Sequence, residues 1–379
     1  MDFKPEKKLG FGLMRMPLTD PTNDAAVDVE QVKKMVDMFI EKGFTYFDTA
    51  WMYNGFNSEN VAKEALVSRY PREAFTLATK LHSSFFNSLE DRDKIFNEQL
   101  NKTGAGYFDY YLLHGIEGSS LPKYEKFQCF DWILEKKQAG LIRHAGFSFH
   151  DKAEVLDKIL TAHPQMEFVQ LQINYRDWES EWIESRKCYE VAEKHGIPVI
   201  VMEPVKGGTL ANVPDSVQDM FKAHDSKMSI PSWAIRFVAS LPNVMVVLSG
   251  MSNIAQMEDN TSFMQDFVPL TEEEKKLCLK AADFINGQIA IPCTGCSYCT
   301  DGCPMNIAIP QYFSLYNEDM REDLSQKGWT ASFNSYGQLA RDFGKPSDCI
   351  ACGQCEGVCP QHLPIIENMK KLSEHYANA

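Results

Sequence analysis

Eight cysteines near the C-terminus repeat one spacing twice, and this spacing suits a particular chemistry. Each run reads Cys-x-x-Cys-x-x-Cys-x-x-x-Cys-Pro. Thiolates spaced in this way can reach the corners of one iron–sulfur cube, which leaves the cysteine before the proline to reach a second cube. Zinc sites and disulfides are the alternatives, but zinc sites typically use cysteine pairs separated by a longer loop. The pattern therefore predicts two [4Fe–4S] clusters, held by Cys293, Cys296, Cys299, Cys303, Cys349, Cys352, Cys355 and Cys359.

The two runs resemble those of two-cluster ferredoxins, and the resemblance implies how the sulfurs are shared. Each cluster would take three cysteines from one run and the fourth from the other. We therefore expect an electron-transfer domain over residues 286–379, because neighbouring clusters pass electrons singly. The expected sets are Cys293, Cys296, Cys299 and Cys359 for one cluster, and Cys349, Cys352, Cys355 and Cys303 for the other.

Four polar residues earlier in the chain could perform acid–base chemistry. Asp48, Lys80 and His114 each end a short apolar run, and Tyr53 follows Asp48 by five residues. A phenol has an unperturbed pKa near 10. A neighbouring ammonium favours the phenolate, so Lys80 is expected to lower the pKa of Tyr53, with Asp48 holding Lys80 in place. His114 would donate a hydrogen bond to an oxygen on which negative charge develops.

These residues need a scaffold in which successive strand ends converge. Over the first 285 residues, β-branched and aromatic runs alternate with amphipathic helical stretches, as in consecutive βαβ units. A (β/α)₈ barrel needs about 250 residues, and no G-x-G-x-x-G follows the first strand, which argues against an open doubly wound sheet. We predict a (β/α)₈ TIM barrel over residues 1–285, with strands at Leu9–Met14, Thr45–Asp48, Phe75–Lys80, Tyr107–His114, His144–Phe149, Phe168–Gln172, Pro198–Glu203 and Val244–Ser249.

The predicted helices follow from apolar periodicity and capping residues. Val29–Lys42 and Asn60–Ser68 are expected to pack on the barrel. Pro269–Ala282 is expected to be its last helix, with Thr271 as the N-cap. Helical spacing between the two cysteine runs predicts a mostly helical C-terminal domain.

Residues 8 to about 285 resemble the aldo-keto reductase family. The opening Leu9-Gly10-Phe11-Gly12-Leu13-Met14-Arg15 and the strand Ala145-Gly146-Phe147-Ser148 match the family. Its Asp–Tyr–Lys–His tetrad maps onto Asp48, Tyr53, Lys80 and His114. The resemblance implies that a nicotinamide lies across the barrel mouth and delivers hydride to a carbonyl carbon, with Tyr53 as the acid.

The resemblance also implies contacts to the nicotinamide half of the nucleotide. Ser148 and Gln170 would hold the carboxamide, although Phe149 stands where the family usually has asparagine. Met202 takes the place of an aromatic residue that often stacks on the ring. Lys206 would serve the pyrophosphate, with a solvated rim charge as the alternative.

The adenine half of the predicted site departs further from the family. Gly250 and Gln256 occupy positions where basic residues usually grip a 2′-phosphate, whereas Asp259 and Asn260 keep the acid–amide pair that contacts adenine. A phosphate without a basic partner loses its charge-assisted bonds. Of NAD(H) and NADP(H), we therefore favour NADH, with contacts at Met14, Arg15, Ser148, Gln170, Met202, Lys206, Gly250, Asp259 and Asn260.

Hydride transfer moves two electrons, whereas a cluster passes one at a time. Coupling two-electron hydride transfer to one-electron transfer by a cluster normally needs a flavin, and the chain shows no short flavin-binding motif. The leading hypothesis is a carbonyl reductase or alcohol dehydrogenase using NAD(P)H, accompanied by two clusters. The second is an electron-transfer reductase, in which the clusters feed a flavin or the substrate directly and Tyr53 and His114 supply protons. The third is a redox-sensing or interaction protein with a vestigial barrel.

Composition bounds the partners. The formal net charge is −14 with no basic run, so nucleic acid and anionic membranes are not expected partners, although a basic redox protein could dock. The N-terminus has no signal-peptide pattern, and the apolar run Val244–Leu248 is too short to cross a bilayer. Eleven cysteines without an export signal predict a reducing cytoplasm. The three outside the runs, Cys129, Cys188 and Cys278, are expected to be buried as small apolar side chains.

Overall fold

The computed structural model describes residues 3–180, 183–287, 289–320 and 331–377. Eight parallel strands close into a barrel in chain order, and β8 returns to pair with β1. The predicted fold is confirmed, and each predicted strand overlaps an observed one. The strands are β1 (Leu9–Gly12), β2 (Tyr46–Asp48), β3 (Thr76–His82), β4 (Phe108–Ile116), β5 (Ile142–Phe149), β6 (Phe168–Gln172), β7 (Val199–Met202) and β8 (Val244–Ser249).

Strands β3 and β4 run further than predicted. Lys80 and His114 therefore lie two residues before their strand ends rather than at them. The parallel register pairs His82 with His114, which places two imidazoles side by side at the barrel mouth. His82 lies beyond the predicted strand Phe75–Lys80, so this pair does not follow from the sequence.

The helices that surround the barrel follow the predicted pattern. Helix α1 buries Val32, Met35, Val36 and Phe39 on one face, and Asp28 caps its N-terminus. Thr271 forms a capping box with Glu274 at the start of the last barrel helix, as the N-cap prediction required. The barrel helices are α1 (Val29–Glu41), α2 (Tyr53–Phe56), α3 (Ser58–Ala62), α4 (Leu89–Thr103), α5 (Leu121–Lys126), α6 (Cys129–Gln138), α7 (Ala153–Ala162), α8 (Ser185–Lys194), α9 (Asp215–His224), α10 (Ile230–Ala239), α11 (Ile254–Gln265) and α12 (Glu272–Asn286).

Short helical turns complete the barrel. The helix predicted at Asn60–Ser68 is α3 continued by a π-helical turn at Lys63–Val67. Single 3₁₀ turns occupy Arg72–Ala74, Ser83–Phe85 and Lys206–Gly208. Cys129, Cys188 and Cys278 are buried in the barrel core, which confirms that prediction.

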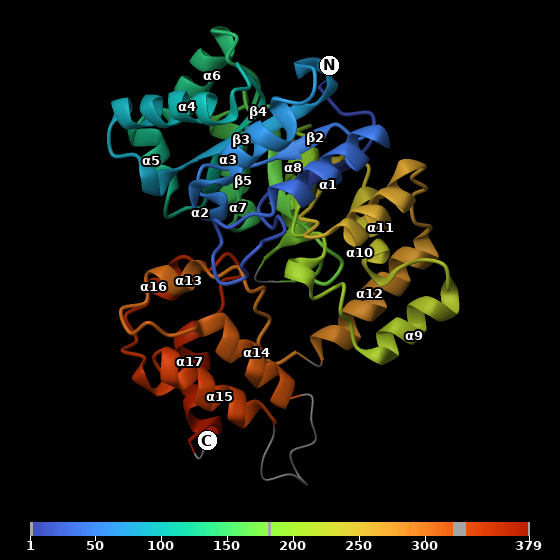
Figure 1. Cartoon of the computed structure of the whole chain (residues 1–379), viewed down its shortest axis with the longest axis vertical. Helices are drawn as coiled ribbons and strands as arrows, with labels where there is room; N and C mark the ends of the chain where they lie inside the picture. Colours follow the sequence, from blue (N-terminus) through green and yellow to red (C-terminus); the bar gives the residue numbers. More distant parts are fainter. Residues whose placement is uncertain (1–2, 181–182, 288, 321–330, 378–379) are drawn as a thin grey trace.

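The C-terminal domain is helical and has a core of its own. It contains α13 (Tyr298–Asp301), α14 (Ile309–Asp319), α15 (Ala331–Asp342), α16 (Gln354–Gly357) and α17 (Ile365–His375), with a 3₁₀ turn at Pro346–Asp348. Figure 1 shows these helices gathered at one end of the barrel. Tyr312, Phe313 and Leu372 are buried there beside Cys299, Cys355 and Cys359. Within the described ranges, no helix is long and apolar enough to cross a membrane.

Candidate active site and cluster sites

The carboxyl ends of the strands open into one large cavity that the C-terminal domain helps to enclose. Its volume, including the space open to solvent, is about 2450 Å³. Asp48, Tyr53 and His114 line it from the barrel, and Cys296 and Tyr298 line it from the C-terminal domain. The cavity is therefore shared between the two parts of the chain.

The predicted acid–base residues meet at this mouth. Lys80 Nζ lies 2.5 Å from Asp48 Oδ1 and donates to the carbonyl oxygen of Thr49 at 2.7 Å. The same ammonium lies 3.3 Å from the Tyr53 hydroxyl. Lys80 is 1% exposed and Asp48 3%, so the ion pair is isolated from water and fixed in one geometry.

The backbone after Tyr53 holds the phenol in place. Tyr53 begins α2, and the next residues Asn54, Gly55 and Phe56 all have left-handed φ values, of 51°, 59° and 66°. Asn54 Nδ2 donates to the carbonyl oxygen of Asp24 at 3.2 Å, which helps to fix this conformation. Consecutive left-handed residues of this kind are costly and cluster at functional sites.

The pKa of Tyr53 moves in the direction opposite to the one predicted. Burial raises it well above its ordinary value, the carboxylates of Asp48 and Glu203 raise it further, and Arg15 opposes the rise. The physical reason is that Asp48 neutralises Lys80 at 2.5 Å, so little positive charge is left to stabilise a phenolate. Tyr53 is therefore a protonated phenol at neutral pH. That state suits a proton donor.

Three histidines face the cavity as neutral imidazoles. Burial lowers the pKa of His114 well below its ordinary range, and Lys80, His82 and His150 add to this. Burial likewise lowers the pKa of His82 and of His150 to about 4. The His114 ring contacts Tyr53 edge-on, with 5.9 Å between centroids, and its Nδ1 has no hydrogen-bond partner within the described ranges. His114 can therefore donate a hydrogen bond without carrying a charge.

The buried histidines predict an acid-dependent loss of stability. The unfolded chain binds protons at His82 and His150 below pH about 6.5, whereas the folded chain does so only near pH 4. The free energy of unfolding should therefore fall as pH drops through this window, by up to about 3 kcal/mol for each histidine. Urea unfolding at a series of pH values measures this fall. A His82→Asn/His150→Asn variant should show a flatter dependence, and an unchanged slope would contradict the assignment.

Most predicted nucleotide positions line the cavity. Met14, Gln170 and Met202 are among them, and Gln170 Oε1 is buried without a partner within the described ranges. The others on the wall are Arg15, Gly250, Asp259 and Asn260. Asp259 accepts a hydrogen bond from Ser229 Oγ at 2.6 Å, and Asn260 Nδ2 donates to Ser249 Oγ at 2.8 Å.

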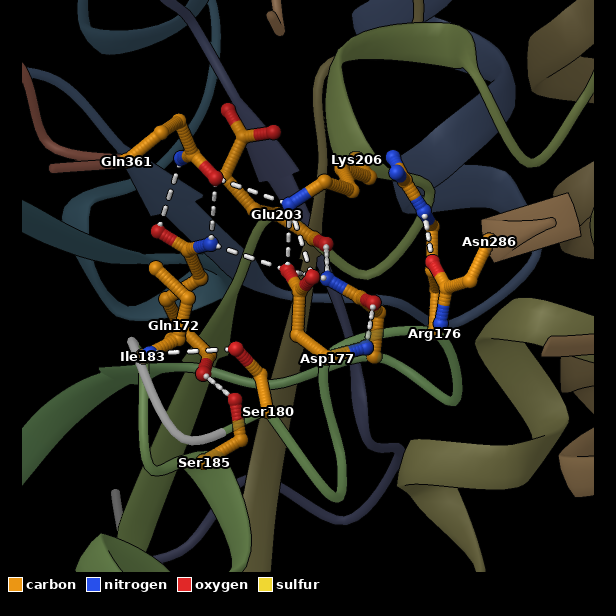
Figure 2. A network of polar contacts seen from close by, with 11 residues as sticks. Gln172, Arg176, Asp177, Ser180, Ile183, Ser185, Glu203, Lys206, Asn286 and Gln361 are labelled. Atoms are coloured by element: carbon orange, nitrogen blue, oxygen red, sulfur yellow. Dashed lines mark hydrogen bonds and ion pairs between the residues drawn. The ribbon is translucent and has the colours of Figure 1, made fainter. Parts of the chain in front are cut away.

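Two predicted nucleotide contacts lie elsewhere. Ser148 is buried below the cavity, and its Oγ accepts a hydrogen bond from the Gly115 backbone at 2.7 Å. Lys206 is 2% exposed, and its Nζ lies 2.6 Å from Asp177 Oδ2. Figure 2 shows the two side chains facing each other. It also donates to Gln361 Oε1, so its three protons have acceptors inside the protein. This lysine is therefore neither a pyrophosphate ligand nor a solvated rim charge, the two alternatives that the sequence predicts. Its ammonium is instead bound by Asp177, which lies in the loop after β6.

The cavity wall is acidic. Among the described residues that line it, Arg15 is the only arginine or lysine, and its guanidinium lies 3.8 Å from Glu203. The acidic members are Asp48, Glu117, Glu203, Asp259 and Asp301. At the predicted adenine end, Gly250 and Gln256 provide no positive charge. A 2′-phosphate would therefore gain no charge-assisted bond there.

The cysteines gather into two groups of four around separate cavities. Each group takes three cysteines from one run and the fourth from the other. A cavity of about 310 Å³ is lined by Cys293, Cys296, Cys299 and Cys359, and one of about 360 Å³ by Cys303, Cys349, Cys352 and Cys355. These are the groups that the sequence predicts. All eleven cysteines are free, so the disulfide alternative is not formed.

The surroundings of the sulfurs suit a cluster. Ile309 lies between the two cavities and lines both. Backbone amides of Gly295 and Ile307 donate to Cys293 Sγ at 3.4 Å and to Cys303 Sγ at 3.5 Å. Apolar walls with amide donors to sulfur are the environment of protein-bound iron–sulfur clusters. Among the described residues, no three His, Cys, Asp or Glu side chains lie close enough together to hold a single metal ion.

One cysteine group adjoins the active-site cavity. Thr294, Cys296 and Gln361 line both the large cavity and the cavity of the Cys293 group. A single layer of side chains therefore separates this group from the space above Tyr53 and His114. The sequence could not reveal this contact, because it joins Tyr53 and His114 to a wall formed by residues that lie far along the chain, from Thr294 onward.

Comparisons with known proteins match two separate parts of the chain to two families. Residues 8–283 match the model of the Aldo/keto reductase family, and residues 292–363 match that of the 4Fe-4S dicluster domain. The uncharacterized oxidoreductase YqkF of Bacillus subtilis (strain 168) is 26% identical over 274 residues, covering 64% of this chain and 84% of that protein. A 9,11-endoperoxide prostaglandin H2 reductase of Trypanosoma cruzi is 24% identical over 277 residues, covering 71% and 85%.

Solved structures share the barrel. The holo form of the aldo-keto reductase AKR11C1 from Bacillus halodurans superposes with a TM-score of 0.56 at 25% identity, covering 72% of this chain and 91% of that one. An aldo-keto reductase from Klebsiella pneumoniae in complex with NADPH superposes with a TM-score of 0.57 at 18% identity, covering 73% and 90%.

Proposed function

The chain is an oxidoreductase that belongs to the aldo/keto reductase family and carries a C-terminal 4Fe-4S dicluster domain, and from this premise we propose that it reduces a carbonyl compound, or oxidises the corresponding alcohol, with NAD(P)H. The observation that supports this most is the buried Asp48–Lys80 pair, 3.3 Å from the protonated phenol of Tyr53 at the mouth of a large cavity.

Each residue of the tetrad has one task in this proposal. Tyr53 gives its proton to the substrate oxygen, and its raised pKa keeps that proton available until charge develops there. His114 donates a hydrogen bond to the same oxygen while remaining neutral. Asp48 holds Lys80, and Lys80 positions the hydroxyl of Tyr53. A bound reduced nicotinamide supplies the hydride, so that hydride and proton together convert a carbonyl into an alcohol.

The nucleotide would occupy the long axis of the cavity. Gln170 would hold the carboxamide through its unpartnered Oε1, and Met202 would lie against the ring. Asp259 and Asn260 would contact the adenine, and Arg15 would be the nearest cation to the phosphates. NADH is the preferred form, because a 2′-phosphate would find no basic partner beside Gly250 and Gln256.

A single substitution should shift this preference. Gln256→Arg places a guanidinium at the end of the cavity where the 2′-phosphate would lie, and a charge-assisted hydrogen bond of this kind contributes about 1.5–3 kcal/mol. The Kd for NADPH should therefore fall by roughly 10- to 100-fold while that for NADH changes little. Fluorescence titration of both nucleotides measures the effect, with Gln256→Leu as the uncharged control. An equal gain for NADH would count against the predicted placement of adenine.

The eight cysteines would hold two [4Fe–4S] clusters in the two cavities, and each bound cluster accepts and donates electrons singly. The Cys293 group places its sulfurs in the wall of the active-site cavity through Cys296. The C-terminal domain would therefore serve both as a lid over the barrel mouth and as an electron port into it.

The shared wall supports a second candidate function. Electrons could pass one at a time from the side of Cys296 to a flavin or to the substrate in the cavity, with Tyr53 and His114 as proton donors. A soluble redox protein would then supply the electrons. In this alternative, no hydride leaves a nicotinamide.

Hydride tracing tests the leading proposal. The anaerobically reconstituted full chain is given NADH carrying deuterium at C4 and a panel of aldehydes and ketones, and the products are analysed by mass spectrometry. Transfer of one deuterium to the carbonyl carbon supports the proposal. Reduction without label, driven by a reduced electron donor, would overturn it in favour of the second candidate.

A further inference from the structure

A buried polar network joins the barrel to the second cysteine run. Lys206 Nζ lies 2.8 Å and 2.6 Å from the two carboxylate oxygens of Asp177 and donates to Gln361 Oε1 at 2.8 Å. Gln172 and Gln361 exchange amide hydrogen bonds of 3.0 Å in both directions. Figure 2 shows that Gln361 approaches from the C-terminal domain, whereas Gln172 ends β6, and Asp177 and Lys206 lie in the segments that follow β6 and β7.

Because the network is buried, it is stable only while each of its charged groups keeps its partner. Lys206 is 2% exposed, Asp177 5%, and Gln172 and Gln361 6% each. A buried charge that loses its partner destabilises a protein by several kcal/mol, so both charges are held where they are. Gln361 follows Cys359 by two residues and lines the cavity of the Cys293 group. The network therefore fixes the cysteine that the second run contributes to this group.

The network also brings positive charge close to the sulfurs. Lys206 donates to Gln361, and Gln361 lines the cavity of the Cys293 group together with Cys293 and Cys359. A polar cavity of about 910 Å³, including open solvent, is lined by both Cys293 and Arg176. Arg176 is 7% exposed and donates from Nε to Asn286 Oδ1 at 2.8 Å, but its buried terminal nitrogen Nη1 has no hydrogen-bond partner among the residues described.

Two cations of the barrel thus lie on the side of one cysteine group, and Asp177 lies beside both, so that these three side chains carry one net positive charge. A [4Fe–4S] centre with four thiolates is anionic and gains one more negative charge on reduction. Local charge is one of the factors that set its reduction potential. Positive charge nearby favours the reduced state, and negative charge favours the oxidised state.

We propose that Lys206 and Arg176 are positioning residues for the redox centre of the Cys293 group: Lys206 docks the second cysteine run through Gln361, and the net positive charge of Lys206, Arg176 and Asp177 raises the reduction potential of this centre. This inference rests on the proposed presence of two clusters. It does not depend on which substrate the barrel reduces.

Substitutions that remove opposite charges from one ion pair distinguish an effect of charge on the reduction potential from an effect of domain docking. The reconstituted full chain is titrated potentiometrically and followed by electron paramagnetic resonance, which resolves two centres. Lys206→Met should shift the potential of one centre to more negative values, whereas Asp177→Asn should shift the same centre to more positive values. Both variants break the same contact, so a role limited to docking would move the potential in one direction for both, and that result would overturn the proposal.

Further variants keep the test decisive. If Lys206→Met does not fold, Arg176→Gln removes one cation without breaking an ion pair and should also lower the potential of that centre. Arg186→Gln, on the exposed face of α8, is the matched control and should leave both potentials unchanged. An unshifted potential in Arg176→Gln and Asp177→Asn contradicts the proposal, as does the absence of two [4Fe–4S] signals in the unmodified protein. Deuterium transfer from NADH, measured separately, tests the barrel chemistry and leaves this comparison unaffected.

Discussion

Replacing Tyr53 with phenylalanine should lower kcat/KM for carbonyl reduction by about 10²- to 10⁴-fold, the range that a positioned general acid contributes. The ring and its contact with His114 are retained, so the loss comes from the missing proton. The Kd for NADH should stay within about twofold, because in our proposal the hydroxyl serves the substrate oxygen and not the nucleotide. Steady-state kinetics with the best substrate of the panel, together with nucleotide titration, measure both quantities.

Tyr298→Phe provides the matched control. Its phenol lines the same cavity but comes from α13 in the C-terminal domain, and among the described contacts Lys80 donates to the hydroxyl of Tyr53 and not to that of Tyr298. We expect its activity to fall far less than that of Tyr53→Phe. Near-normal turnover in Tyr53→Phe, or an equal loss in both variants, would contradict the assignment of Tyr53 as the acid.

Replacing Cys303 with serine should remove one cluster and spare the one beside the barrel. Although Cys303 belongs to the first run, its side chain lines the cavity of Cys349, Cys352 and Cys355. Iron content should therefore fall from about eight to about four atoms per chain, and one of two electron paramagnetic resonance signals should disappear. NADH binding and deuterium transfer should persist, because the Cys293 group still closes the cavity.

Cys359→Ser is the reciprocal variant. It should remove the cluster of the Cys293 group and leave the other, although Cys359 belongs to the second run. Its effect on the barrel should be the larger of the two, since Gln361 follows it and bonds to Lys206. If Cys303→Ser instead loses the signal of the Cys293 group, the sulfurs are shared differently from the arrangement described above.

Much of the scaffold follows from local sequence. Parallel strands of a barrel are short β-branched and aromatic runs, so all eight could be located to within two residues. The grouping of the cysteines is implied by the resemblance of the two runs to those of two-cluster ferredoxins, in which the fourth thiolate of each run binds the other cube. In both cases the determining residues lie close together in the chain.

The electrostatics of the site could not be read in this way. The expectation for Tyr53 counted the charge of Lys80 but not the depth of burial or the contact with Asp48, and these reverse the direction of the pKa shift. His82 and His150 carry no motif, and only the strand register and the closed cavity bring them to His114. Burial of titratable groups is a property of the assembled fold.

The contacts of Lys206 also could not be predicted from the sequence, because they join the barrel to the C-terminal domain. Lys206-Gly207-Gly208 suggests a phosphate loop, yet its ammonium is held by Asp177 and by Gln361, which lies 155 residues further along the chain. Gly207 marks the same junction. A side chain there would meet the Thr294 carbonyl at 2.4 Å, so glycine is required where the C-terminal domain packs on the barrel.

Anaerobic titration of the reconstituted full chain with NADH tests most directly whether the barrel mouth is a nicotinamide site beside a cluster. Nucleotide fluorescence and iron–sulfur absorbance are followed together. We expect saturable binding of one NADH per chain, little change of cluster absorbance with NADH alone, and bleaching when a flavin is added as a two-to-one electron mediator. Absence of nucleotide binding, with the protein folded and both clusters present, would contradict the account.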